Sequence, residues 1–376
     1  MAKWFVSAKK ADFNGIGEKY HISPVLARII RNRNLVEEHE IEKFLYGTLA
    51  DIYDGSQLKD MDKAVGILWD KIQQGKKIRV IGDYDVDGIC ATYILKKGLL
   101  LCGADVDTVI PHRIKDGYGI SEQLIEDAYE EGVDMIVTCD NGIAAYSQIE
   151  FAVSKGITCI ITDHHEVPYE LIEEKKVYRL PPAEAIIDPK QEDCSYPYKN
   201  ICGAVVAWKV VSKLWESIAV SENDRREILE FAGIATICDV MELLDENRII
   251  VKEALKSMSH SANLGLRSLI KVHDLNASTL SAYHIGFVLG PCFNATGRLD
   301  SAGRTMELLE CKKEREAVLL ASELKRLNES RKEMTEKGVE EAILKIEEEN
   351  LQKDSVMVVY LPDCHESLAG IIAGRL

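Results

Sequence analysis

The feature that most constrains the fold is an alternation of short apolar runs and helix-like segments between residues 77 and 188. Runs such as "IRVIG" and "TCIIT" are short and rich in β-branched residues, while the segments between them carry apolar residues at helical spacing. Strands that alternate with helices imply right-handed crossovers and a mainly parallel sheet with helices on both faces. The pattern therefore predicts an α/β fold built on a mainly parallel sheet.

Acidic residues and histidines follow these apolar runs directly. In chain order they are Asp83, Asp85 and Asp87 after "IRVIG", Asp140 after "DMIVTC", and Asp163, His164 and His165 after "TCIIT". A further apolar segment, "FAGIATICDVMEL", reads as a helix or a strand and ends in Asp239. Ligands of such sheets bind beyond the carboxyl ends of the strands, so we expect these side chains to meet at one edge.

Like charges this close together would repel each other and raise one another's pKa, so the cluster needs a positive partner. Oxygen and nitrogen ligands without thiolates suit Mn²⁺ or Mg²⁺. A carboxylate shared by two ions, with flanking carboxylates and a histidine, is typical of a two-metal centre.

Each motif taken alone has a simpler explanation. Asp85 or Asp87 could cap the helix that follows, and "DNG" at 140–142 could be a turn. "DHH" could be a solvated loop, and Asp239 could cap a helix or lie on the surface. The coincidence of four such positions in one sheet favours the metal site. Asp163 is the least certain ligand, because it could instead hydrogen-bond a histidine and fix its tautomer.

Composition narrows the class of protein without settling its partner. The chain has 376 residues, a net charge of −16 and a pI near 5.1, which argues mildly against a large non-specific nucleic-acid surface but leaves room for a local basic track. No apolar stretch is long enough to span a bilayer, and the N-terminus does not resemble a secretory signal, so we expect a cytoplasmic protein. The ten cysteines are scattered singly, which indicates reduced buried thiols and makes a thiolate zinc site unlikely.

The pattern changes along the chain predict four parts. They are an N-terminal helical segment (1–50), a catalytic domain (51–303), one long connecting helix (304–350) and the beginning of a second α/β domain (351–376). In the last part, "DSVMVVYLP" predicts a strand and "HESLAGIIAGRL" a helix. A domain that begins and does not finish suggests that the chain is a fragment.

The motifs "DYDVDG", "CDNG", "DHH" and "CDVMEL", in this order and spacing, resemble motifs I to IV of the DHH phosphoesterase superfamily. Three further stretches, "IPHRIKDGYG", "LGPCFNATGRLDSA" and "HESLAGIIAGRL", resemble the RecJ-type single-stranded-DNA-specific exonucleases within it. The sequence departs from the family pattern at Cys139 and Cys292, and in "CGAVVAW", which has fewer glycines than usual. The last departure leaves the local loop shape open.

The resemblance implies roles for individual residues. It implies that two metal ions, usually Mn²⁺, are bound by Asp83, Asp85, Asp87, Asp140, His164 and Asp239. It implies that His165 lies beside the scissile phosphate and assists catalysis, with water activated between Asp140 and Asp239. It also implies that Arg113, Asn294, Arg298 and His365 contact or face the DNA. A surface salt bridge is the simpler explanation for Arg113 and Arg298.

The activity implied by the resemblance is removal of nucleotides from the 5′ end of single-stranded DNA in repair and recombination. The implied partners are a single-strand-binding protein and a RecQ-type helicase. Two alternatives stay open at this point. One is an oligoribonuclease or cyclic-dinucleotide phosphodiesterase with the same core, and the other is a metal-binding scaffold of a replication complex.

Overall fold

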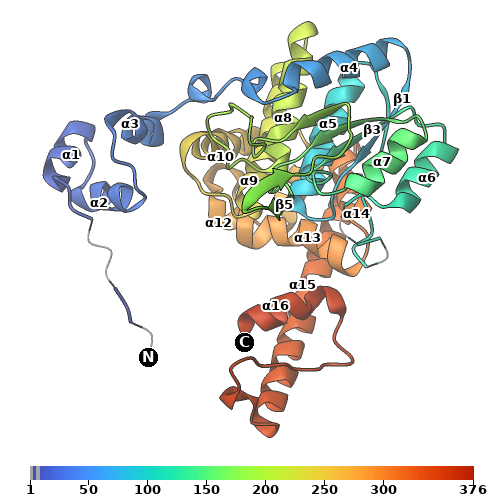
Figure 1. Ribbon diagram of the computed structural model, residues 1–376. Helices are drawn as coiled ribbons and strands as arrows, with labels where there is room; N and C mark the ends of the chain where they lie inside the picture. Colours follow the sequence, from blue (N-terminus) through green and yellow to red (C-terminus); the bar gives the residue numbers. More distant parts are fainter. Residues whose placement is uncertain (1–2, 6–8, 115, 118) are drawn as a thin grey trace.

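A computed structural model describes residues 3–5, 9–114, 116–117 and 119–376 (Figure 1). Within them, the main sheet has five strands, all paired in parallel, in the order β2-β1-β3-β4-β7. This confirms the predicted α/β class. The strands of this sheet are β1 (Lys77–Ile81), β2 (Asp105–Val109), β3 (Met135–Cys139), β4 (Thr158–Thr162) and β7 (Ala185–Ile187). A separate antiparallel hairpin is formed by β5 (Tyr169–Ile172) and β6 (Lys175–Tyr178).

The helices surround this sheet and extend beyond it at both ends of the chain (Figure 1). They are α1 (Phe13–Tyr20), α2 (Pro24–Asn32), α3 (Glu38–Tyr46), α4 (Met61–Gln73), α5 (Val86–Leu101), α6 (Glu122–Glu130), α7 (Tyr146–Ser154), α8 (Gly203–Leu214), α9 (Glu222–Cys238), α10 (Asp245–Ser257), α11 (Leu264–Val272), α12 (Ala282–His284), α13 (Gly290–Leu299), α14 (Gly303–Glu310), α15 (Glu314–Glu348) and α16 (Glu366–Arg375).

Two hydrophobic cores cover the two faces of the sheet. Ile78 and Val80 of β1 belong to the larger core, with α4, α5, α8 and α9, whereas Ile81 belongs to the smaller core, with α6 and α7. This alternation is the period of two expected of a strand whose successive side chains point to opposite faces. Because both faces are buried, the polar side chains of the strands' carboxyl ends gather at the edge between the layers.

The first three helices form a small cluster of their own and dock on α10. Tyr20, Ile30 and Phe44 are buried in this cluster. The docking combines apolar packing of Leu244 with polar contacts. Lys43 forms an ion pair of 2.7 Å with Asp245, and the Arg248 side chain donates to the main-chain oxygen of Phe44 at 2.6 Å.

The prediction of a single long helix over 304–350 is wrong in detail, because the chain forms two helices there. The extended residues 311–313 separate α14 from α15, and the Cys311 thiol bonds to the main-chain oxygen of Lys313 at 3.3 Å. The long helix is therefore α15 alone. Gly338 in its interior lets α16 approach closely, since a Cβ atom there would lie 2.4 Å from Ile372.

The strand predicted from "DSVMVVYLP" is not formed. The side chains of Val356, Val358 and Tyr360 are about three-quarters exposed, and no described strand pairs with this segment. A strand needs a partner for its backbone groups, and β-branched composition alone does not supply one. The helix predicted after it is confirmed as α16.

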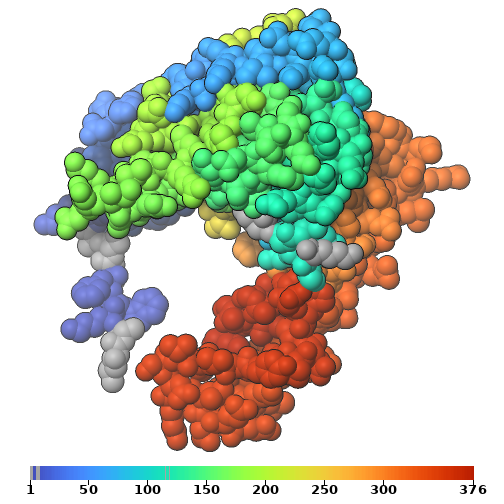
Figure 2. Space-filling view, turned by 45° about the vertical axis from the view of Figure 1, so that its right-hand side comes forward, coloured from blue at the N-terminus to red at the C-terminus, as the bar shows by residue number. Residues whose placement is uncertain are grey.

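The space-filling view shows a hollow between the C-terminal part, in red, and the green part of the chain that carries the middle of the sheet domain (Figure 2). A search of the described helices found none that is long and apolar enough to cross a membrane.

Candidate metal centre

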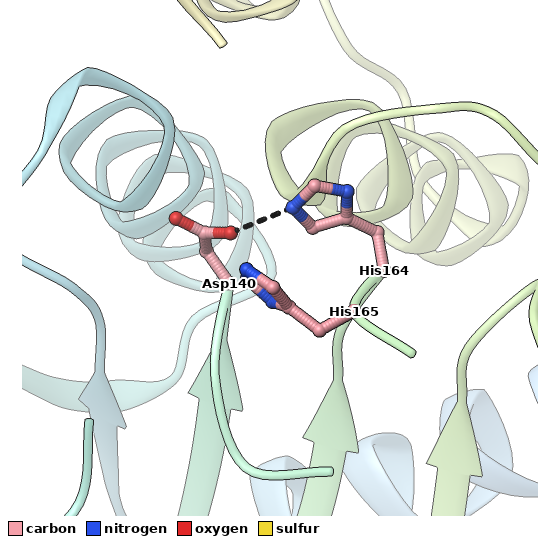
Figure 3. Close-up of side chains that lie close together, drawn as sticks. All are labelled: Asp140, His164 and His165. Atoms are coloured by element: carbon pink, nitrogen blue, oxygen red, sulfur yellow. Dashed lines mark hydrogen bonds and ion pairs between the residues drawn. The ribbon is translucent and has the colours of Figure 1, made fainter. Parts of the chain in front are cut away.

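The predicted cluster forms at the carboxyl edge of the main sheet. Strands β1, β3 and β4 are followed by Asp83, Asp140 and Asp163, and Asp239 joins them from the C-terminal end of α9. His164 and His165 come from the same loop as Asp163, and Figure 3 shows both rings beside Asp140. Four segments far apart in the sequence therefore deliver their polar side chains to one place.

The first motif uses its three aspartates in different ways. Asp85 caps α5, because its Oδ1 atom accepts hydrogen bonds from the backbone N–H groups of Asp87 (2.9 Å) and Gly88 (3.1 Å). Asp87 accepts from the N–H groups that begin α8, at Gly203 (2.7 Å) and Ala204 (2.8 Å). The helix-capping explanation for Asp85 is thus confirmed, and its geometry leaves the second carboxylate oxygen for a ligand.

Close backbone packing holds Asp83 and Asp140 in position. A Cβ atom at Gly88 would lie 2.5 Å from the main-chain oxygen of Asp83, and one at Gly203 would lie 2.8 Å from the Cβ atom of Asp140. Asp140 itself has a positive φ of 58°, a conformation that non-glycine residues rarely adopt. Backbone strain of this kind is concentrated at functional sites.

One nitrogen of His164 faces three carboxylates. Its Nε2 atom lies 3.0 Å from Asp140 Oδ1, 3.5 Å from Asp87 Oδ2 and 3.8 Å from Asp239 Oδ2. The dashed line in Figure 3 marks the shortest of these contacts. Burial lowers the pKa of His164, so the ring is neutral at pH 7 and suited to bind a metal.

Asp163 lies behind the histidines. It accepts from the N–H groups of Ile143 (2.9 Å), His164 (2.7 Å) and His165 (3.2 Å), and from His165 Nδ1 at 2.7 Å. With so many donors on one carboxylate, Asp163 positions the imidazole of His165. The hydrogen bond that His165 donates to Asp163 raises the pKa of His165, and burial only partly opposes it.

The positive charges around the cluster compensate its carboxylates only in part. Burial and the neighbouring Asp85 raise the pKa of Asp83 to about 7, and burial and Asp87 raise the pKa of Asp239 to about 7. The pKa values of Asp85 and Asp140 are raised by burial and by the same carboxylates. Such shifts show that the folded chain alone does not favour the charged forms, and a bound cation would reverse them.

The donor set fits hard divalent ions. Three groups of side chains have ligand atoms within 4.8 Å of one another: Asp83, Asp85 and Asp140; Asp87, His164 and Asp239; and Asp140, His164 and His165. The buried Oδ1 atom of Asp83 has no hydrogen-bond partner in the described chain, which suits a ligand atom. Burial raises the pKa of the nearby thiols of Cys139 and Cys238 to about 12, so they are poor thiolate ligands.

Of the four residues expected near the substrate, two come together beside the cluster. Arg113 and Arg298 line a cavity of about 410 Å³ with Glu366, Ser367 and residues near them. Arg113 stacks on Tyr84, with its guanidinium carbon 4.6 Å from the ring centroid, and Arg298 donates to the main-chain oxygen of Ser367 at 2.5 Å. Lys115 and Tyr118, in the motif that carries Arg113, lie outside the described residues.

The other two residues lie next to this cavity. Asn294 lines a neighbouring groove with Arg298, Arg331 and Lys332. His365 precedes α16, and its Nδ1 atom lies 2.7 Å from the hydroxyl of Ser367. The salt-bridge explanation for Arg113 and Arg298 finds no support, since neither forms an ion pair with a described carboxylate.

Sequence reasoning missed three contributors. The backbone N–H groups of Gly203 and Ala204 hold Asp87, and side-chain patterns give no signal for them. Asp188 directly follows β7 at the same edge and is fully buried, and burial with the charge of Asp163 raises its pKa to about 7. Its position directly after the short apolar run "AII" was a usable signal.

Comparison with known proteins agrees with this fold. The model of the DHH family, N-terminal domain, matches residues 77–237, which places the chain in the DHH class of α/β domains. The single-stranded-DNA-specific exonuclease RecJ of Bacillus subtilis (strain 168) is 34% identical over 375 residues, covering 100% of this chain and 46% of that protein. The RecJ exonuclease of Escherichia coli (strain K12) is 33% identical over 370 residues, covering 94% of this chain and 62% of that protein.

A solved structure of exonuclease RecJ bound to manganese superposes with a TM-score of 0.74 at 31% identity, covering 85% of this chain and 77% of that one. The chain belongs to the RecJ family of the DHH superfamily. It spans less than two thirds of the length of the two curated relatives.

Proposed function

We propose that this chain is the catalytic part of a two-metal exonuclease that hydrolyses single-stranded DNA from its 5′ end. The observation that carries the proposal is the convergence of six carboxylate and imidazole ligands beside a cationic cavity. The RecJ relatives, whose names specify single-stranded DNA, support the choice of substrate.

The ligands would be Asp83, Asp85, Asp87, Asp140, His164 and Asp239, with Asp140 common to two of the three groups. Two Mn²⁺ or Mg²⁺ ions bound there would supply Lewis acidity and lower the pKa of a water molecule. The chain's own contribution is to hold the six ligands rigidly, through the cap at Asp85, the α8 backbone at Asp87 and the strained turn at Asp140.

His165 is the residue proposed to act on the scissile phosphate. Asp163 fixes its Nδ1–H, which directs the other nitrogen away from Asp163. Because the hydrogen bond to Asp163 raises the pKa of His165, its imidazole stays protonated to a higher pH than an ordinary one. It can then stabilise negative charge on a phosphate oxygen or give a proton to the leaving oxygen.

The cavity at Arg113 and Arg298 is proposed to hold the 5′-terminal phosphate. Two guanidinium groups beside each other match the geometry and charge of a phosphate. Burial, together with the charge of Arg113, lowers the pKa of Arg298, and the charge of Asp85 only partly opposes this. A bound phosphate would add a negative charge beside both guanidinium groups.

The direct test is Asp140→Ala, which should abolish digestion of single-stranded DNA in Mn²⁺ while leaving the circular dichroism spectrum unchanged. Asp105→Ala is a matched control, because Asp105 is an exposed aspartate that begins β2 at the opposite edge of the sheet. Digestion by Asp140→Ala at the wild-type rate would refute the site assignment.

The domain boundaries, location and partners are also proposals. We infer the division at residues 50, 303 and 350 and a cytoplasmic location, where the ten free cysteines stay reduced. Family membership supports partnership with a single-strand-binding protein and a RecQ-type helicase, which co-purification with the full-length protein would test.

A further inference from the structure

Charged side chains form a row along the carboxyl edge of the sheet. The strand order β2-β1-β3-β4-β7 places Arg113 beyond β2, the metal ligands beyond β1, β3 and β4, and Lys190 beyond β7. With neighbouring strands about 4.8 Å apart, the four intervals span roughly 19 Å. Cations therefore flank the metal cluster on both sides, and only the Arg113 side has been given a role above.

The turn after β7 holds Lys190 firmly. Its backbone N–H donates to Asp188 Oδ1 at 2.7 Å, and the side chain of Gln191 donates to the main-chain oxygens of Ile186 (2.8 Å) and Asp188 (3.3 Å). The Lys190 ammonium lies 3.1 Å from Glu166 Oε1. Because Glu166 directly follows His165, the ammonium lies beside the loop that carries the catalytic histidine.

The ion pair of Lys190 is one that a phosphate can replace. The Glu166 side chain is 87% exposed, whereas that of Lys190 is 22% exposed. An ion pair with so exposed a carboxylate is worth little, because water competes for both charges. A phosphate diester held over the cluster would offer a second anion at the same ammonium.

We propose that Lys190 binds a phosphate of the single strand on the 3′ side of the scissile bond, opposite the 5′-end cavity at Arg113 and Arg298. The inference rests on the proposed function. The strand then crosses the sheet edge from β7 to β2, with its 5′ end at Arg113. Lys190 is a substrate-binding residue in this arrangement, and its contact requires a substrate that extends beyond the scissile phosphate.

The experiment compares Lys190→Gln with wild type on 5′-phosphorylated DNA of two, five and fifteen nucleotides in Mn²⁺. Binding is measured in parallel on the fifteen-nucleotide strand with phosphorothioate linkages that block hydrolysis, at several salt concentrations. Lys76→Gln is the matched control, because Lys76 is an ion-paired lysine (2.8 Å to Asp134) at the amino edge of the same sheet.

Lys190→Gln should raise KM about fivefold on the five- and fifteen-nucleotide strands and leave kcat unchanged. The kinetics of dinucleotide hydrolysis should stay at the wild-type values. The slope of log affinity against log salt should become smaller by about 0.7. Glu166→Gln, which releases the ammonium, should leave binding equal or tighter. The inference is overturned if Lys190→Gln matches wild type on all lengths, or if it loses kcat and melting temperature equally on all of them, as a purely structural lysine would. If wild type itself neither binds nor digests single strands, the proposed function fails instead.

Discussion

The sheet carries two clusters of charged residues, which differ in how their carboxylates are paired. In the first, Arg79 on β1 is nearly buried and donates two hydrogen bonds to Asp107 on β2 and one to Glu131. Arg79 and Asp107 are direct neighbours in the strand register. In the second, burial and the charges of neighbouring carboxylates raise the pKa values of Asp83 beyond β1 and Asp140 beyond β3.

The pKa directions separate the two clusters. Burial alone would raise the pKa of Asp107, but the hydrogen bonds and charge of Arg79 leave it lowered. At the edge, burial and neighbouring carboxylates raise the pKa of Asp83 to about 7. The chain satisfies its structural charges internally and leaves its functional ones for a cation, so a raised pKa in a cluster indicates what the molecule must bind.

The largest expected difference between the two clusters follows from removing one carboxylate of each. Asp239→Asn should lower kcat on single-stranded DNA by at least about 10³-fold, because several kcal/mol of Lewis-acid stabilisation depend on the site. Asp107→Asn should leave kcat within twofold but reduce the free energy of unfolding by about 1–2 kcal/mol, since Asp107 is partly exposed. Urea unfolding and single-turnover kinetics on both variants measure the two effects, and equal effects on activity would erase the distinction.

A smaller loss is expected from the residue behind the cluster. Asp163→Asn should lower kcat about 10–100-fold while Mn²⁺ binding is largely kept, because Asp163 positions His165 and is not placed as a ligand. The variant should also shift the kcat–pH profile downward, since the pKa of His165 would lose the hydrogen bond that raises it. A normal profile with abolished Mn²⁺ binding by calorimetry would show instead that Asp163 is a ligand.

A smaller effect on activity is expected from Arg113, in the cavity beyond β2. Arg113→Gln should reduce the preference for 5′-phosphorylated over 5′-hydroxyl strands about five- to tenfold, as one charge-assisted contact is lost. Arg267→Gln is a suitable control, since that arginine donates to main-chain oxygens of the loop before α11. An unchanged preference in Arg113→Gln would move the 5′ end away from this cavity.

Much of this could be predicted from the sequence, because the strands are marked by local patterns. Short apolar runs placed β1, β3 and β4, and the polar residues directly after them had to lie at one edge. Two errors arose where local pattern is insufficient. Residues 355–361 have strand composition but no described strand beside them, and the break at 311–313 has no proline or glycine to announce it.

The site shows the same limit. Ligand types were readable, but the support of Asp87 by Gly203 and Ala204 depends on a helix more than 100 residues away. Lys190 carries no motif, and only the strand order brings it next to the histidine loop. Packing between distant parts of the chain determines such contacts, and no local pattern in the sequence indicates them.

The smallest effect, and the finest test of the comparison, is the pH dependence of stability without metal. Asp83 and Asp239 have pKa values of about 7 when folded, against about 4 for an unfolded aspartate. The folded chain therefore binds more protons, so this stabilisation is present below pH 4 and is lost as the pH rises through 7. Asp107 has the opposite sign: its lowered pKa adds stability above pH 4 that is lost on acidification.

In EDTA, the melting temperature should therefore fall between pH 5.5 and 8, on the order of 5 °C. Saturating Mn²⁺ should remove that fall and stabilise more at pH 8 than at pH 6, because protons compete with the metal for the same carboxylates. A variant carrying Asp83→Asn and Asp239→Asn should show a flatter profile in EDTA and respond less to Mn²⁺. If wild type in EDTA is instead more stable at pH 8 than at pH 5.5, the edge carboxylates are compensated within the chain, as Asp107 is, and the distinction between the two clusters fails.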